Sequence, residues 1–565
     1  MKLGFTLLAT LALAFNINAQ YKPSNLTPQK EFEAKKWVDN TYNSLSQDEK
    51  LGQLFIVALY TNKGNDHIQQ IRDIVTKDKI GGLILMQDNA TMHINLVNEF
   101  QKKSKVPMMI GIDGEWGVYQ RIATAHKYPW ALTLGAIQDK NLIYQMSQKI
   151  AEDCQRLGVN WDFAPVVDVN TNPNNPIIGN RSFGSDVKNV VESASFYTNG
   201  LQDNKILGAI KHFPGHGDTS TDSHLDLPLV QHPLSRLENV ELAPFQKMID
   251  KGVGGIMVAH LYVPALESQN GVPASVSHAI VTDLLKDKMG YKGLIITDAL
   301  NMGAVANKYK AGELDAMAFK AGNDIMLFSQ GVAEGKRLIQ KAIDNGEISQ
   351  KRVEESVKKI LLTKYYLGLN QYTAINPENV DTDLNNSTHT ELIQNLYSNA
   401  MTLLKNNNDV LPLKKSEKVY YLPLEEAPSK TFQKALAKEI NIIPVNAADV
   451  NKIPANAKVI IGLHKDNSTA YKPYKISEAS KKIIQRITAK NNVILALFGS
   501  PYALKDMDIS KTKATVVVYE NNDDSMNAAA KALKGETSIT GRLPVEVTVT
   551  LPYGSGIDLK ANSTK

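Results

Sequence analysis

The chain has 565 residues, 43% of them hydrophobic and 21% charged, a composition typical of globular proteins with more than one domain. Its 63 basic and 58 acidic residues nearly balance, and there are no long basic runs. This balance argues against nucleic acid as a partner. The only cysteine, Cys154, cannot form an intrachain disulfide, and we expect it to be an inert thiol buried on a helical apolar stripe.

The N-terminus has the pattern of a secretory signal peptide over residues 1–19. Lys2 precedes an apolar run over residues 3–15, and small residues up to Ala19 stand before Gln20. The run is too short to span a bilayer, and no later apolar segment approaches about 18 residues. We therefore expect an exported protein, periplasmic or extracellular, without a transmembrane span in its mature form.

Eight short, β-branched apolar runs follow, separated by stretches with helical spacing. They are residues 54–59, 82–86, 108–113, 161–166, 207–212, 255–260, 294–298 and 324–328. Continuous apolar strands that alternate with helices indicate a parallel sheet covered on both faces, and eight such units match a (β/α)8 barrel of the TIM type. We place this catalytic domain at residues 20–370. Several runs end in a polar residue, as the strands of barrel enzymes do: Gln87, Asp113, His212, His260 and Asp298.

A second domain follows a polar segment. Residues 371–390 are rich in Asn, Asp and Pro and lack a sustained apolar period, which predicts a linker. Beyond it, apolar runs at 419–422, 459–463, 493–498 and 515–519 alternate with helical segments. This pattern predicts a smaller α/β sandwich domain over residues 391–565.

Residues 211–224 concentrate three histidines and two aspartates in fourteen positions. Gly215 and Gly217, next to Pro214, exclude a regular helix or a central strand there. The segment is therefore predicted to be a loop that leaves a strand end with its polar groups in a cleft. Its residue types would suit zinc, but their spacing fits neither the helical His-Glu-x-x-His pattern nor a short structural clamp. We expect neither a metal nor a cofactor.

This loop closely resembles the signature of the family 3 glycoside hydrolases, in their bacterial β-N-acetylglucosaminidase branch. The signature comprises Lys-His-Phe-Pro-Gly-His-Gly at 211–217, followed by Asp-Ser-His at 222–224. The resemblance covers nearly all of residues 45–365, and residues 400–550 look like the family's C-terminal sandwich. It implies a retaining exo-β-N-acetylglucosaminidase that removes terminal β-linked N-acetylglucosamine from peptidoglycan fragments or related glycans.

Carried over by motif, the resemblance implies that Asp298 is the nucleophile, His224 the general acid/base and Asp222 the partner that orients His224. Retaining cleavage needs a carboxylate beneath the anomeric carbon and a proton donor near the leaving oxygen. A histidine titrates near neutrality, and a nearby aspartate favours its charged form, so it can donate a proton and later recover one. We expect His216 only to shape the glycine loop and His260 only to cap a strand.

The resemblance also implies five residues that bind the sugar: Asp113, Arg121, Arg181, Lys211 and His212. Asp113 and Arg121 are the first and last residues of the segment 113–121, which resembles the family's Asp-x-Glu-Gly-Gly-x-Val-x-Arg motif. Trp116 stands where the family has glycine, and an aromatic wall there would change which group is tolerated beside the sugar. For Arg181, an ion pair that only braces its loop is the alternative.

Two other functions stay open at this point. A β-glucosidase or β-xylosidase of the same family would take its acid from the second domain, where Glu520 is the candidate. A glycan-binding protein without catalysis is the other. The sequence does not decide between water and inorganic phosphate as acceptor, nor does it identify the natural aglycone or the oligomeric state.

Overall fold

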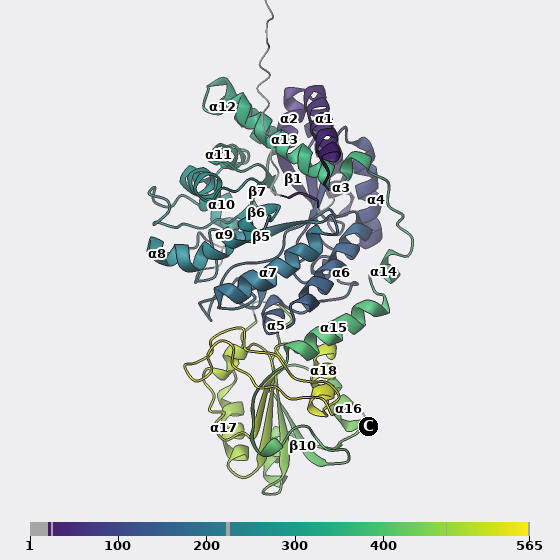
Figure 1. Ribbon diagram of the computed structural model, residues 1–565, viewed down its shortest axis with the longest axis vertical. Helices are drawn as coiled ribbons and strands as arrows, with labels where there is room; N and C mark the ends of the chain where they lie inside the picture. Colours follow the sequence, from purple (N-terminus) through teal and green to yellow (C-terminus); the bar gives the residue numbers. More distant parts are fainter. Residues whose placement is uncertain (1–20, 24–25, 222–225, 470–471, 563–565) are drawn as a thin grey trace, which may run out of the picture.

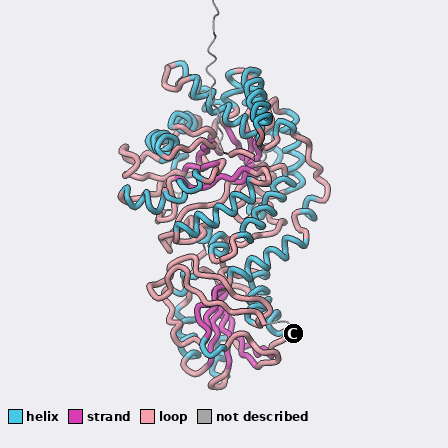
Figure 2. The backbone as a smooth tube through the Cα atoms, viewed as in Figure 1, coloured by secondary structure: helices cyan, strands magenta, loops and turns pink. Residues whose placement is uncertain are grey.

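The computed structural model describes residues 21–23, 26–221, 226–469 and 472–562, which form two α/β units stacked along the long axis of the molecule (Figure 1). The predicted signal peptide, Asp222 and His224 lie outside the described residues. Figure 2 shows the strands in two separate groups, one in each unit. Among the helices described, none combines the length and apolarity that a membrane span requires.

The first unit is an eight-stranded parallel barrel. Its strands are β1 (Phe55–Leu59), β2 (Gly82–Leu85), β3 (Met109–Ile112), β4 (Trp161–Asp162), β5 (Leu207–Phe213), β6 (Gly255–Val258), β7 (Leu294–Thr297) and β8 (Met326–Leu327). They pair in the order β7-β6-β5-β4-β3-β2-β1-β8, and a parallel bridge between Ile296 and Ile325 joins the two ends of this order. Each of the eight apolar runs coincides with a strand to within a few residues, which confirms the predicted barrel.

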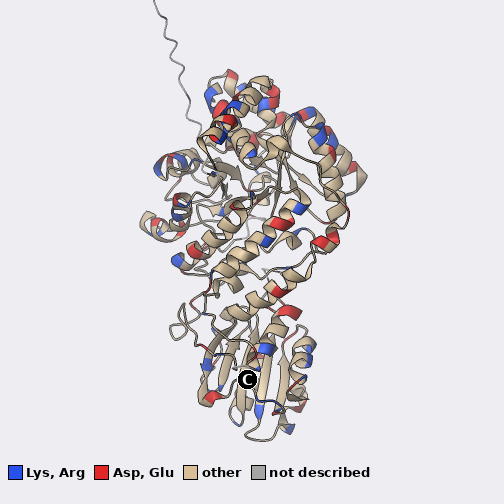
Figure 3. Cartoon of the chain, turned by 45° about the vertical axis from the view of Figure 1, so that its right-hand side comes forward, with Lys and Arg blue, Asp and Glu red and all other residues tan. Residues whose placement is uncertain are grey.

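Amphipathic helices cover the outside of the barrel. They include α1 (Pro28–Ser44), α2 (Gln47–Gly52), α3 (Gly64–Asp78), α4 (Ala90–Lys103), α5 (Ala131–Gly135), α6 (Asn141–Leu157), α7 (Val187–Gln202), α9 (Ala243–Asp250), α11 (Glu313–Ala321), α12 (Val332–Asp344) and α13 (Gln350–Tyr366). In α6 the buried face includes Cys154, as its apolar stripe predicts. Figure 3 shows acidic and basic residues mixed on the outer helices, where pairs such as Lys77 with Asp73 lie one helical turn apart.

The second unit contains a six-stranded sheet in the order β11-β10-β12-β13-β14-β9. Its strands are β9 (Thr402–Asn406), β10 (Lys418–Leu424), β11 (Asn441–Pro444), β12 (Lys458–His464), β13 (Asn492–Phe498) and β14 (Ala514–Val517), and its helices include α15 (Ser387–Ala400), α16 (Lys430–Ala437), α17 (Glu478–Thr488) and α18 (Asp523–Leu533). All pairings are parallel except that of β9 with β14. The four expected runs form β10, β12, β13 and β14, and residues 371–390 include α14 (Val380–Asp383) and the start of α15.

A buried glutamate joins the two units. Glu520, just after β14, is 1% exposed. Its Oε1 accepts hydrogen bonds from the Trp130 amide at 2.8 Å and from the Thr133 hydroxyl at 2.7 Å, both at the start of α5 in the barrel unit. Its Oε2 accepts one from the Tyr397 hydroxyl at 3.0 Å, and the Lys127 ammonium lies 4.0 Å away. Because a buried carboxylate is tolerated only when it is paired, these contacts fix the second unit against the barrel.

Replacing Glu520 tests this junction. We expect Glu520→Ala to lower the free energy of unfolding by about 3 kcal/mol, because the buried donors on Trp130, Thr133 and Tyr397 lose their acceptor. Glu520→Gln keeps a carbonyl oxygen for two of them and should cost less. Urea denaturation followed by circular dichroism measures both, with Glu478→Ala on the exposed face of α17 as a control that leaves stability nearly unchanged. Equal stability of Glu520→Ala and the wild type would contradict the assignment.

Candidate active site

A cavity of about 400 Å³ opens at the carboxyl ends of the barrel strands. Its lining includes Tyr60 after β1, Asp113 after β3, Lys211 and His212 in β5, Asp298 after β7 and Phe328 after β8. This end of a barrel is where enzymes of this fold carry their catalytic groups. The cavity brings together six of the eight site residues that the sequence predicts: Asp113, Arg121, Arg181, Lys211, His212 and Asp298. The other two, Asp222 and His224, lie outside the described residues.

A network of buried charges is centred on Lys211. Its ammonium, on a side chain that is 3% exposed, lies 3.0 Å from Asp113 and 2.8 Å from Glu115. Asp113 also pairs with Arg121. Arg181 donates two hydrogen bonds to Glu115, from Nε at 2.8 Å and from Nη2 at 2.7 Å. Arg181 thus makes the bracing ion pair that the sequence left as an alternative, and it also lines the cavity.

Each charge in this network keeps its neighbours charged. Burial raises the pKa of Asp113 and of Glu115, but nearby cations outweigh it, so the pKa of Asp113 falls to about 2 and that of Glu115 falls further. Burial lowers the pKa of Lys211, but the two carboxylates outweigh it and raise that pKa above its usual value. The cavity therefore presents fixed charges, which form stronger hydrogen bonds with neutral hydroxyl groups than uncharged partners do.

His212 is oriented by Asp168, a residue that sequence reasoning missed. The Asp168 carboxylate accepts a hydrogen bond from His212 Nδ1 at 2.7 Å and from the His216 amide at 2.7 Å. Arg181 Nη2 lies 3.1 Å from His212 Nε2, on the other side of the ring from Asp168. Asp168 lies two residues beyond the apolar run 161–166, so a search for polar residues just past strand ends would have found it.

The glycine loop packs tightly under the cavity. A Cβ atom at Gly217 would lie 1.9 Å from the Val169 carbonyl oxygen, so only glycine fits there. This close approach brings the His216 amide to Asp168. His216 Nδ1 lies 2.6 Å from Thr219 Oγ1 within the same loop, and burial lowers the pKa of His216 to about 4. His216 is thus held by the loop, although it also lines the cavity.

Asp298 is held by backbone contacts at the end of β7. Its amide donates to the Val258 carbonyl at 2.8 Å, and its Oδ1 accepts from the Ala299 amide at 2.8 Å. Burial raises the pKa of Asp298, but His212, His260 and the Ala299 amide together outweigh it and lower that pKa. His260 is fully buried, with its ring nitrogens 2.7 Å from Ser275 Oγ and 3.1 Å from the Ala299 carbonyl. The geometry therefore keeps Asp298 ionised at the cavity.

The aromatic wall expected from Trp116 is present. Trp116 lines the cavity, and its ring lies 4.3 Å from that of Trp130, tilted by 53°. Glu520 of the second unit accepts a hydrogen bond from the Trp130 amide. The second unit therefore supports this wall. Glu520 does not line the cavity, and both of its oxygens already accept hydrogen bonds. It is therefore an interface residue in this structure, not a cavity acid.

The fold and this cavity agree with a comparison against known families. The model of the glycosyl hydrolase family 3 N-terminal domain matches residues 46–363, which is more than half of the chain. The chain belongs to glycosyl hydrolase family 3. The match covers all eight barrel strands and every cavity residue described above.

Comparisons with individual proteins are consistent with this family membership. The chain is 33% identical over 386 residues to β-hexosaminidase A of Pseudoalteromonas piscicida, a match to 62% of this chain and 64% of that relative, less than two thirds of its length. It is 27% identical to a β-N-acetylglucosaminidase/β-glucosidase of Cellulomonas fimi, over 67% and 68% of the two chains. The solved family 3 β-N-acetylglucosaminidase of a Paenibacillus species superposes with a TM-score of 0.73 at 29% identity, covering 90% of this chain and all of that one.

Asp162 in β4 holds the backbone between Asp113 and Glu115, and its protonation state depends on pH. It is fully buried, and its Oδ1 accepts a hydrogen bond at 2.8 Å from the amide of Gly114, between Asp113 and Glu115. No described residue donates to its Oδ2. Burial raises the pKa of Asp162 from 3.8 to about 7, opposed only in part by the Gly114 amide and by Lys211.

Asp162 should therefore make stability depend on pH. In the folded state it stays protonated up to about pH 7, whereas in the unfolded chain it ionises near pH 4, so its contribution is present below pH 4 and is lost as the pH rises to 7. Asp162→Asn keeps the acceptor for Gly114 without titrating. Between pH 4 and pH 7, the free energy of unfolding of the variant should therefore rise by about 2 to 4 kcal/mol relative to that of the wild type. Urea denaturation of both proteins across this pH range measures the difference. The same pH dependence of the free energy of unfolding in the two proteins would refute the prediction.

Proposed function

We propose that this chain is an exported, retaining exo-β-N-acetylglucosaminidase that removes terminal N-acetylglucosamine from peptidoglycan fragments or related glycans. The observation that carries the proposal is the cavity of about 400 Å³ in which ionised Asp298 lies among fixed cations. The names of the relatives support the sugar specificity. The apolar N-terminal run supports export, and N-terminal sequencing of the secreted protein should give Gln20 as its first residue.

In the proposed reaction, the Asp298 carboxylate attacks the anomeric carbon while His224 gives a proton to the leaving oxygen. A covalent glycosyl-enzyme forms. His224 then takes a proton from the incoming water, and this water attacks the anomeric carbon and releases the sugar from Asp298. Asp222 stabilises the imidazolium of His224 between these steps. Hydrogen bonds between charged groups such as Arg121 and sugar hydroxyls contribute roughly 1.5 to 3 kcal/mol each, enough to hold the ring in place.

Among the alternatives, the β-glucosidase with an acid from the second unit loses support, because Glu520 is buried at the interface with both oxygens engaged. Aryl β-N-acetylglucosaminide and aryl β-glucoside, assayed side by side, separate the two sugar specificities. Running each assay with and without inorganic phosphate, with product analysis, identifies the acceptor. A glycan-binding protein would cleave neither substrate.

Asp298→Ala tests the nucleophile. The variant should keep its fold, because a carboxylate at a strand end contributes little packing, but turnover of an aryl N-acetylglucosaminide should fall by at least about 10³-fold. Circular dichroism checks the fold, and a fluorinated sugar inactivator should label Asp298 of the wild type in peptide mapping. Near wild-type activity in a folded variant would reject the assignment.

His224 and Asp222 should act as one unit. Protonation matters most when the leaving oxygen is a poor leaving group, so His224→Ala should slow a disaccharide far more than an aryl glycoside with an acidic phenol. Asp222→Asn should act in the same direction but more weakly. The double variant should be little worse than His224→Ala, because groups that act together are not additive. Equal losses on good and poor leaving groups would mean that the proton donor lies elsewhere.

A further inference from the structure

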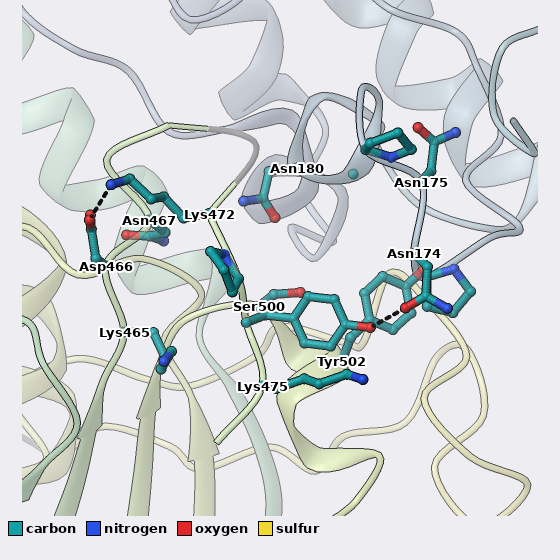
Figure 4. A pocket seen from close by; sticks show the side chains of 15 residues that line it. Asn174, Asn175, Asn180, Lys465, Asp466, Asn467, Lys472, Lys475, Ser500 and Tyr502 are labelled. Atoms are coloured by element: carbon teal, nitrogen blue, oxygen red, sulfur yellow. Dashed lines mark hydrogen bonds and ion pairs between the residues drawn. The ribbon is translucent and has the colours of Figure 1, made fainter. Parts of the chain in front are cut away.

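A second cavity, of about 330 Å³, lies where the two units meet (Figure 4). We call it the interface cleft. From the second unit it is lined by residues 465–467 after β12, by Ser500 and Tyr502 after β13 and by residues 472–475; from the barrel unit it is lined by residues 173–176 and 179–180. The carboxyl ends of neighbouring parallel strands are where open α/β sheets bind ligands. The volume is that of an ordinary small-ligand site.

Aromatic rings and amides line the interface cleft together. The rings of Tyr474 and Tyr502 lie 5.9 Å apart, tilted by 45°. The Tyr474 hydroxyl donates to Asn174 Oδ1 at 3.2 Å, across the boundary between the units, and Asn180 also lines the cleft. Ring faces accept apolar groups, while amides pair with peptide or amide groups. This lining suits a ligand that is both peptide-like and partly apolar.

The three lysines of the interface cleft differ in whether they have an acidic partner. Lys465 pairs with two glutamates at 3.2 and 2.9 Å, and Lys472 pairs with Asp466 at 2.8 Å. For Lys475, which also lines the cleft (Figure 4), no acidic side chain among the described residues lies within ion-pair distance. A carboxylate of a ligand would therefore find a cation there.

One chain segment contributes to the lining of both the interface cleft and the catalytic cavity. In residues 175–181, Asn180 lines the cleft, whereas Ile177 and Arg181 line the catalytic cavity. Asn175 Nδ2 donates to the His216 carbonyl at 2.9 Å, so this segment rests on the glycine loop. That loop leads directly into the segment that contains the proposed acid, His224.

We propose that the interface cleft binds a carboxylate-bearing peptide substituent on the sugar that leaves during cleavage. The proposal rests on the proposed function, in which the leaving group departs on the side of the acid. An extended peptide spans about 3.3 to 3.6 Å per residue, so a peptide of a few residues on the leaving sugar can follow the shared segment 175–181 from the catalytic cavity toward the cleft. Lys475 takes the carboxylate, Asn174 and Asn180 face the amides, and the tyrosine rings face the apolar side chains.

The test uses the full-length protein and a set of disaccharides with terminal β-linked N-acetylglucosamine. The leaving sugar is bare, carries an acidic tripeptide, or carries the same tripeptide with its carboxylates amidated. For the wild type, we expect kcat/KM to be about tenfold higher with the acidic tripeptide than with the bare sugar. In Lys475→Gln this ratio should fall about fivefold. The control, Lys482→Gln on α17, should keep the wild-type ratio.

Salt and amidation separate charge recognition from a structural effect. The advantage of the acidic tripeptide should shrink between 0.05 and about 0.5 M salt in the wild type but not in Lys475→Gln, because screening acts only on a charge pair. The amidated tripeptide should show little of the advantage. Equal kcat/KM for all three disaccharides in the wild type, or an equal loss on all three in Lys475→Gln, would overturn the proposal. Failure to cleave any N-acetylglucosaminide, aryl substrates included, would overturn the proposed function itself.

Discussion

The ammonium of Lys211, buried between the carboxylates of Asp113 and Glu115, is the interaction on which the site depends. An unpaired charge in such a place would cost several kcal/mol, and removing one partner of a buried pair leaves the other uncompensated. Each carboxylate is therefore held by an arginine as well, Asp113 by Arg121 and Glu115 by Arg181. The network can close only if β3, β5 and the segment around residue 181 are brought to one end of the barrel. The site therefore exists only in the closed barrel.

The second unit contributes to the site without adding a catalytic group to the described cavity. Glu520 binds the backbone of Trp130, and the ring of Trp130 supports Trp116 in the cavity wall. The same unit provides one side of the interface cleft. A carboxylate that is buried at a domain boundary with four donors rigidifies that boundary, because any displacement would leave polar groups unpaired. The two units therefore share a wall, and the specificity of the barrel can depend on residues far beyond it in sequence.

Local patterns predicted most of the fold. The eight barrel strands are continuous apolar runs because both faces of a parallel sheet are covered, which gives a strong signal even in strands as short as β4 and β8. The strands that were missed have weaker signals. β11 is a half-exposed edge strand that ends in Pro444, and β9 pairs antiparallel at the other edge, with its last three residues only partly buried. Edge strands bury one face or less, so their composition resembles that of a loop.

The sequence by itself determined the order of the elements, the polar residues at the strand ends and the family to which they belong. These features are local, since periodicity and motif spacing involve residues within one or two turns of each other. Only the tertiary structure decided which buried polar and charged groups meet. Arg181 pairs with Glu115 across 66 positions, His212 with Asp168 across 44, and Glu520 with Trp130 across 390. Such partners are chosen by the closure of the barrel and the docking of the second sheet, because a buried charge must pair with whichever charge or hydrogen-bond donor the packed fold brings within reach.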